Sequence, residues 1–101
     1  MNNPSHWTIP TDHPSFAGHF PGTPILPGVV LLDTALHAIA AATGIALDNC
    51  EISSVKFLIP ARPGDKLLIQ HSISASGTIR FDIMADMRKI VSGSIVPRST
   101  V

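Results

Sequence analysis

The sequence predicts an α+β domain in which an antiparallel sheet wraps around one central helix. Two observations support this fold class. Residues 28–43 lack proline and carry apolar side chains at helical spacing. After Cys50 the apolar residues instead alternate with polar ones at a period of two, which is typical of half-buried strands. Because the chain has 101 residues, we expect residues 1–101 to form a single domain.

Two segments precede the helix. Trp7 and Ile9 stand at alternate positions within residues 6–10, which indicates a short strand that a proline ends. Residues 11–27 are dense in Pro, Gly, Asp and Ser, and they also hold large apolar side chains that favour order. Ordered loops of this length in a small domain are usually functional, so we expect this one to carry the chemistry.

We expect the helix to run from Gly28 to about Thr43 and to stop at Gly44, because glycine is common just after a helix C-terminus. One apolar face is continuous, and we expect it to be buried. This face holds Val29, Leu32, Leu36, Ile39 and Thr43. The opposite side holds Asp33 and His37. Since the helix is apolar on most sides and rich in alanine, a sheet can close around it.

Four consecutive antiparallel strands are expected after Cys50. They cover residues 54–59, 67–73, 80–87 and 90–96. The turn signals between them are Arg62-Pro63-Gly64-Asp65, Ser76-Gly77 and a tight turn near Arg88-Lys89. His71 lies on an apolar strand face, where we expect a satisfied core histidine. Such a sheet has two open edges, and edge-to-edge pairing of two copies would cover one of them.

Composition argues against several classes of function. Seven basic and seven acidic residues cancel, and the basic ones are scattered, so we expect no nucleic-acid partner. The most apolar run, residues 29–47, contains Asp33 and His37, so we expect no membrane span. No secretory signal pattern stands at the start, and we expect a cytoplasmic protein. The charged fraction is only 14%, below the roughly 25% of ordinary domains, which indicates a buried subunit interface.

The sequence also argues against a metal site. Cys50 is the only cysteine, and we expect it to be a small buried apolar residue. His6, His13 and His71 show no metal-ligand spacing with any cysteine or carboxylate cluster. Motifs typical of nucleotide binding, zinc proteases and serine hydrolases are absent.

The residues most suited to catalysis lie between Gly18 and Asp33. An imidazole moves protons near neutral pH, and a carboxyl group in apolar surroundings favours its neutral, proton-donating form, so His19 and Asp33 fit an acid/base pair. The backbone N–H of Gly28, at the helix start, could polarise a carbonyl oxygen. From the residues alone, structural roles are the stronger interpretation for all three residues. Asp33 could interact with the helix dipole, His19 could anchor the loop by hydrogen bonds, and Gly28 could be needed only for its backbone angles.

His37 lies one turn after Asp33 and faces the same side of the expected helix. It could orient the carboxylate, or it could be a simple i, i+4 partner. Both interpretations stay open.

A dense, gapless set of residues in the loop and the first helical turns carries a family resemblance. The set is Gly18, His19, Phe20, Pro21, Gly22, Pro24, Pro27, Gly28, Leu32 and Asp33. It resembles the signature of the beta-hydroxyacyl-acyl-carrier-protein dehydratases, which have the hotdog fold. Residues 55–57 and 62–67 resemble that family's next strand and turn, and the similarity extends over most of the chain from about Phe16. Asp33 matches the branch with aspartate on the central helix, and His37 stands where glutamine is common.

The resemblance implies a dehydratase mechanism. His19 would take the α-proton of a 3-hydroxyacyl thioester, Asp33 would protonate or orient the departing hydroxyl, and the Gly28 N–H would hold the thioester carbonyl. The products would be a trans-2-enoyl thioester and water, in fatty-acid or related specialised lipid or polyene biosynthesis. The other substrate-binding residues would be Phe20, Pro27 and His37.

The resemblance also implies partners. The acyl group would arrive on the phosphopantetheine of an acyl carrier protein, steered by Lys56, Arg62 or Lys66, and no metal or nucleotide cofactor would be needed. Two copies would form a homodimer with composite sites, in which the histidine of one chain acts with the acid of the other. Two alternatives stay open: a non-catalytic dehydratase-like partner subunit, and an acyl-thioester hydrolase on the same fold.

Overall fold

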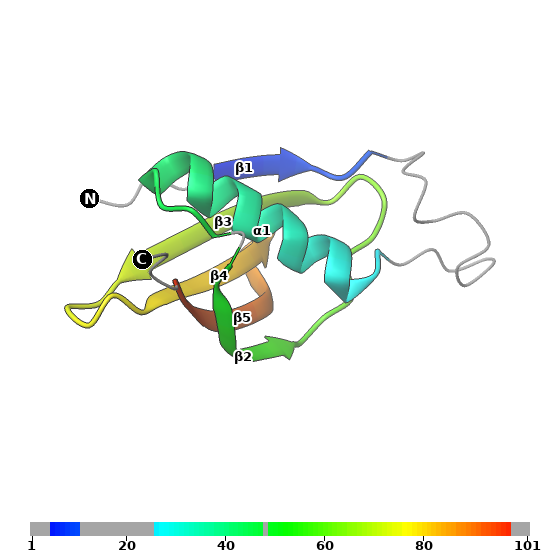
Figure 1. Ribbon diagram of the computed structural model, residues 1–101. Helices are drawn as coiled ribbons and strands as arrows, with labels where there is room; N and C mark the ends of the chain where they lie inside the picture. The colour runs from blue at the N-terminus through cyan, green and yellow to red at the C-terminus, as the bar shows by residue number, and fades with distance from the viewer. Residues whose placement is uncertain (1–4, 11–25, 48, 98–101) are drawn as a thin grey trace.

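One helix and five strands form the part of the chain that the computed structural model describes, residues 5–10, 26–47 and 49–97. In chain order they are β1 (Ser5–Thr8), α1 (Gly28–Thr43), β2 (Glu51–Phe57), β3 (Lys66–Ile73), β4 (Ile79–Ala85) and β5 (Arg88–Val96). The strands form one antiparallel sheet, and α1 lies across one of its faces (Figure 1). The α+β class and the bounds of the helix are confirmed.

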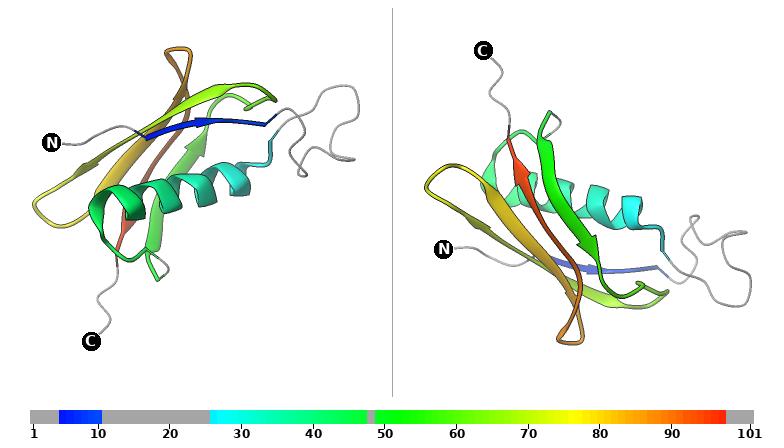
Figure 2. Two further views of the ribbon diagram at one scale, coloured as in Figure 1. Left: turned by 90° about the horizontal axis from the view of Figure 1, so that it is seen from above. Right: turned by 90° about the horizontal axis from the view of Figure 1, so that it is seen from below.

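The strands stand in the order β1-β3-β4-β5-β2 across the sheet. Hairpins join β3 to β4 and β4 to β5. β2 pairs with β5, although the next strand in the chain is β3. The connection from β2 to β3 therefore crosses over β5 and β4. Figure 2 shows that the sheet curves around α1 and that, among the described residues, its outer face carries no helix. Because β1 and β2 stand at the two ends of the strand order, they are the edges of the sheet.

The core lies between α1 and the inner face of the sheet. Facing pairs on β4 and β5 are Ile79 with Ile95, Phe81 with Gly93, and Ile83 with Val91. A Cβ on Gly93 would come within 2.8 Å of the Phe81 ring, so glycine makes room for this ring. His71 on β3 is 9% exposed in the same layer, which confirms the expected core position.

The buried face of α1 differs from the expected one. The buried side chains are Leu31, Ala35 and Ile39, each at most 2% exposed. Val29 is instead 72% exposed, and Leu32 and Leu36 are only half-buried. Because α1 is apolar at nearly every angle, its sequence fits several faces, and the face with the small Ala35 at its centre is the one that meets the sheet.

Glycines end the helix and form two turns where they were expected. Gly44 has φ 76° and donates its N–H to the Ala40 carbonyl at 2.9 Å. Gly64 and Gly77 have φ 84° and 91°, in the turns before β3 and between β3 and β4. These conformations favour glycine because it has no Cβ.

Several boundary and burial expectations are wrong. β2 ends at Phe57, so Leu58 lies outside it, although its N–H still donates to the Ile90 carbonyl at 2.8 Å. The tight turn falls at Asp86 and Met87, whose φ values of 48° and 66° match a two-residue hairpin loop. Met87 is therefore 94% exposed rather than part of the inner face. Cys50, expected to be buried, is only half-buried.

Candidate active site

The start of α1 is fixed against the segment that follows β2. The Leu26 N–H donates to the Ala61 carbonyl at 2.8 Å, and both residues are buried. Pro27 is the N-cap, makes no side-chain cap bond, and accepts the Val30 N–H at 3.0 Å. Gly28 therefore opens the helix with a backbone N–H that has no acceptor within the helix.

Asp33 and His37 lie one turn apart on the face of α1 opposite its buried side chains. His37 Nδ1 is 2.8 Å from the backbone oxygen of Asp33 and 3.5 Å from its Oδ1. The side chains are 70% exposed for Asp33 and 78% for His37. Within the described residues, the apolar surroundings expected around Asp33 are therefore not provided, because the apolar side chains next to it in sequence point to other faces.

A hollow of about 490 Å³ follows this exposed side of α1. Its lining combines Asp33 and His37 with the apolar side chains of Leu36, Ala40, Ala46 and Leu47. A carboxylate and an imidazole thus stand at the rim of an apolar depression. Another molecule that covered the depression would remove both groups from water.

The structure describes four of the six expected site residues. His19 and Phe20 lie outside the described residues, and the roles expected for them stay predictions. Asp33 and His37 are in contact. Gly28, preceded by Pro27, borders a separate hollow beside the first turn of α1.

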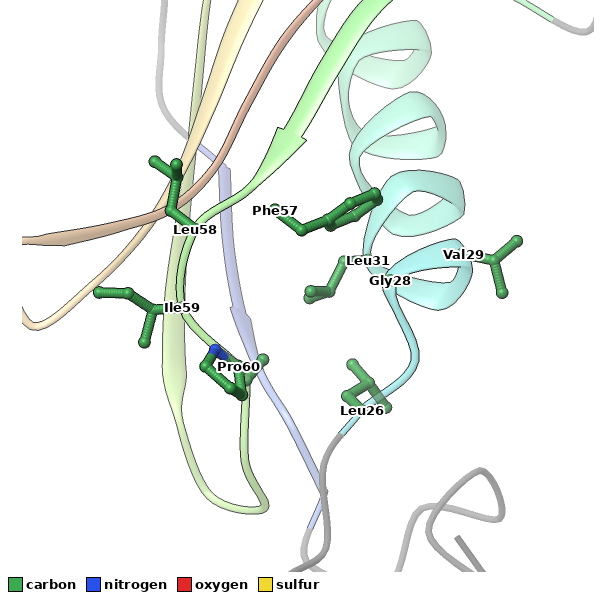
Figure 3. Close-up of a pocket in the computed structure, with 9 residues that line it drawn as sticks. Leu26, Gly28, Val29, Leu31, Phe57, Leu58, Ile59 and Pro60 are labelled. Atoms are coloured by element: carbon green, nitrogen blue, oxygen red, sulfur yellow. The ribbon is translucent and has the colours of Figure 1, made fainter. Parts of the chain in front are cut away.

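This second hollow, the α1–β2 slot, lies between the first turn of α1 and the segment that leaves β2 (Figure 3). Its volume is about 600 Å³, within the range of small-molecule pockets. The side chains and backbone that line it include Leu26, Gly28, Leu31, Phe57, Leu58 and Pro60. An apolar slot that ends at an uncapped helix N-terminus suits a ligand with a carbonyl oxygen and a hydrocarbon chain.

Phe57 is a site residue that the sequence reasoning did not single out. The period-two alternation indicates only that residues 54–59 form a strand. In the structure β2 is an edge strand, at the opposite side of the sheet from β1. The Phe57 ring therefore borders the slot and stays 51% exposed.

β2 is exposed along almost its whole length. Val55 alone among its seven residues is half-buried, and Ile52 is 43% exposed. Near its start, Ser53 forms a bulge, and its Oγ lies 2.6 Å from Ser94 Oγ. A long edge strand with exposed apolar side chains is a surface suited to pairing with another chain.

Lys56, Arg62 and Lys66 are all exposed. The Arg62 backbone N–H donates to Asp65 Oδ2 at 2.9 Å, which closes the turn before β3. These three cations are therefore accessible to an acidic partner.

Within residues 5–10, 26–47 and 49–97, no group of three or more His, Cys, Asp or Glu side chains is placed to hold a metal ion. In the same part of the chain, no helix has the length and apolar character needed to cross a membrane.

A helix packed along one face against a curved antiparallel sheet, with a slot at the helix start, defines a hotdog-fold protein, and solved structures agree. The chain superposes on "The Dehydratase Heterocomplex ApeI:P from Xenorhabdus doucetiae" with a TM-score of 0.78 and 28% identity, over 94% of this chain and 85% of that one. An uncharacterized protein from Erwinia carotovora subsp. atroseptica gives a TM-score of 0.70 and 29% identity, over 92% and 79%.

The model of the ApeI-like family, described as ApeI dehydratase, matches residues 3–94, and the chain belongs to this family. It is also similar to the 3-hydroxyacyl-acyl-carrier-protein dehydratase FabZ of Chlamydia trachomatis, with 37% identity over 75 residues, 65% of this chain and 49% of the relative. FabZ of Geobacter metallireducens is 30% identical over 100 residues, 90% of this chain and 65% of the relative. The chain thus spans between about half and two thirds of these relatives, and the resemblance to hotdog dehydratases is confirmed.

Proposed function

We propose that this protein catalyses the reversible dehydration of 3-hydroxyacyl thioesters carried by acyl carrier protein. The observation that carries the proposal is the Gly28 N–H, which opens an uncapped helix beside the apolar α1–β2 slot. A thioester carbonyl at this N–H would leave the acyl chain in apolar surroundings. Membership of a dehydratase family supports the same chemistry.

The reaction is a β-elimination. His19 removes a proton from C2 of the substrate, the C2–C3 double bond forms, and the bond between C3 and the hydroxyl oxygen breaks. Asp33 gives a proton to the departing hydroxide, which leaves as water. The Gly28 N–H stabilises the negative charge that develops on the thioester oxygen as the C2 proton leaves. The same groups act in reverse when water adds to the enoyl thioester.

A second copy of the chain completes the site. A carboxyl group that donates a proton near neutral pH needs apolar surroundings, and the Asp33 side chain is 70% exposed in its own chain. Pairing through β2 would form a homodimer and cover the exposed Ile52 and Phe57 side chains. In this homodimer His19 of one chain acts with Asp33 of the other, while Phe20, Pro27 and His37 contact the substrate.

The acyl group needs no further cofactor, because the carrier protein delivers it on phosphopantetheine. The carrier is acidic, and the exposed Lys56, Arg62 and Lys66 side chains attract it. The pathway is the biosynthesis of fatty acids or related lipids, in the cytoplasm.

One observation favours a second candidate, a non-catalytic partner subunit. The similar structure from Xenorhabdus doucetiae is a dehydratase heterocomplex. By this alternative, the β2 edge would pair with a related dehydratase chain rather than with a second copy.

Incubation of the purified protein with 3-hydroxyacyl and trans-2-enoyl thioesters, followed by mass spectrometry, separates these functions. Interconversion of the two thioesters supports the dehydratase. Release of free thiol indicates a thioester hydrolase instead, and no reaction at all favours the partner subunit. The matched variants His19→Ala and Asp33→Asn should each abolish interconversion while sedimentation shows an unchanged dimer.

A further inference from the structure

His37 is held to the helix backbone through one of its two ring nitrogens. Nδ1 lies 2.8 Å from the backbone oxygen of Asp33, one turn earlier on α1. A carbonyl oxygen can only accept a hydrogen bond, so Nδ1 carries the proton in this contact. In the neutral imidazole the other nitrogen, Nε2, is then an acceptor with a free lone pair. The contact therefore fixes the tautomer of the neutral His37 ring.

The ring does not hold the Asp33 carboxyl group in the same way. Nδ1 is 3.5 Å from Oδ1, beyond the usual N–H···O distance of about 2.7–3.2 Å. A hydrogen bond from the ring would favour the charged carboxylate, whereas the proposed reaction needs a carboxyl group that keeps its proton. The arrangement leaves the carboxyl group free to face a substrate.

Nε2 is the polar ring atom that remains for a ligand. Among the described residues it has no hydrogen-bond partner, and the His37 side chain is 78% exposed. The ring lines the hollow of about 490 Å³, whose other lining side chains, Asp33 apart, are apolar. A ligand hydroxyl in this hollow therefore finds one acceptor, Nε2, beside one proton donor, the Asp33 carboxyl group.

We propose that His37 binds the 3-hydroxyl group of the substrate by accepting its hydrogen bond at Nε2. This inference rests on the proposed function, in which Asp33 protonates the departing hydroxyl. A hydroxyl that donates to Nε2 presents a lone pair of its oxygen to the Asp33 proton, so the bond between C3 and oxygen breaks as that proton arrives. The water that forms keeps its hydrogen bond to Nε2, and His37 neither gains nor loses a proton. His37 is thus a specificity-determining residue that favours hydroxylated acyl chains over saturated ones.

Two pantetheine thioethers test the proposal on the full chain by calorimetry, one with a 3-hydroxyalkyl group and one with the same alkyl group without the hydroxyl. Neither probe has a carbonyl group to acidify C2, so neither can be dehydrated. A neutral hydrogen bond contributes about fivefold in affinity, and we expect the wild type to prefer the hydroxylated probe by this factor. His37→Leu has no acceptor and should lose the preference.

Two amide variants distinguish the ring nitrogens. A glutamine side chain can place its acceptor oxygen near the position of Nε2, whereas the shorter asparagine side chain ends near the position of Nδ1. His37→Gln should therefore keep most of the preference, and His37→Asn should lose it. Leu36→Ala is the matched control, because Leu36 lines the same hollow without a polar side-chain atom. It should weaken the binding of both probes and leave the ratio of their affinities unchanged.

The nitrogen chemical shifts of the neutral His37 ring report its tautomer without any ligand, and we expect a protonated Nδ1 and an unprotonated Nε2. The proposal is overturned by the opposite tautomer, by a hydroxyl preference that His37→Leu keeps, by equal effects of the two amide variants, or by a wild type that binds neither probe or binds both alike. A change of the affinity ratio in Leu36→Ala as large as that in His37→Leu would also overturn it. A hydroxyl preference that depends on His37, in a protein that dehydrates nothing, supports the role of His37 and overturns only the proposed activity.

Discussion

Gly28→Ala should destabilise the protein even though alanine favours helices. The new Cβ would lie 2.7 Å from Phe57 Cε1, so the ring or the helix start must shift. Overpacking of this kind costs about 1–3 kcal/mol. Because the ring is 51% exposed and can turn toward solvent, we expect the lower half of that range. The helix propensity of alanine returns less than about 1 kcal/mol at the first helical position. The net loss of about 1 kcal/mol would lower the Tm by about 4–8 °C.

The same substitution should have the opposite sign when the ring is absent. In a Phe57→Ala background the steric cost disappears, and Gly28→Ala should raise the free energy of unfolding by up to about 1 kcal/mol, because it removes backbone freedom from the unfolded chain. The coupling energy between the two positions is then about 1–2 kcal/mol. Urea denaturation of the four proteins at one protein concentration measures it. Equal effects of Gly28→Ala in both backgrounds would refute the account of this contact.

Three further substitutions test separate parts of the fold. Met87→Gly should raise the free energy of unfolding by about 1 kcal/mol in urea denaturation, because Met87 has φ 66° and is 94% exposed; a loss of stability would contradict this. Gly44→Ala should lower the same quantity by about 1 kcal/mol, since φ 76° is unfavourable for a residue with a Cβ, and an unchanged urea midpoint would argue against it. Ile52→Asp should weaken the proposed dimer by at least about tenfold in sedimentation, because it places a charge on the pairing strand, and an unaltered dimer would exclude β2 from the interface.

The sequence predicts correctly where the helix begins and ends, but it does not predict which face of the helix is buried. Pro27 and Gly44 are local signals, since each restricts the backbone at its own position, and both bounds of α1 follow from them. The buried face depends on contacts with distant strands. Val29 and Ala35 are both apolar, and only the sheet decides that Ala35 is buried while Val29 is exposed.

The candidate site shows the same division. Gly28, Asp33 and His37 are separated by helical spacing, so their relative placement could be predicted from residue numbers alone. Phe57 could not be placed, because its surroundings depend on β2 pairing with β5 at the sheet edge rather than with its neighbour in sequence, β3. The lack of cover over Asp33 is also a property of the assembled fold, since it depends on which face of α1 meets the sheet.

Mixing two inactive variants tests the central claim, a dehydratase site shared between two copies of the chain, most directly. His19→Ala and Asp33→Asn would each be inactive alone. After unfolding and refolding together in equal amounts, half of the dimers would contain one chain of each kind, and each of these would hold one intact site. The account predicts a recovery of about a quarter of wild-type interconversion of hydroxyacyl and enoyl thioesters. No recovery, with mixed dimers demonstrated by mass spectrometry, would contradict the shared site.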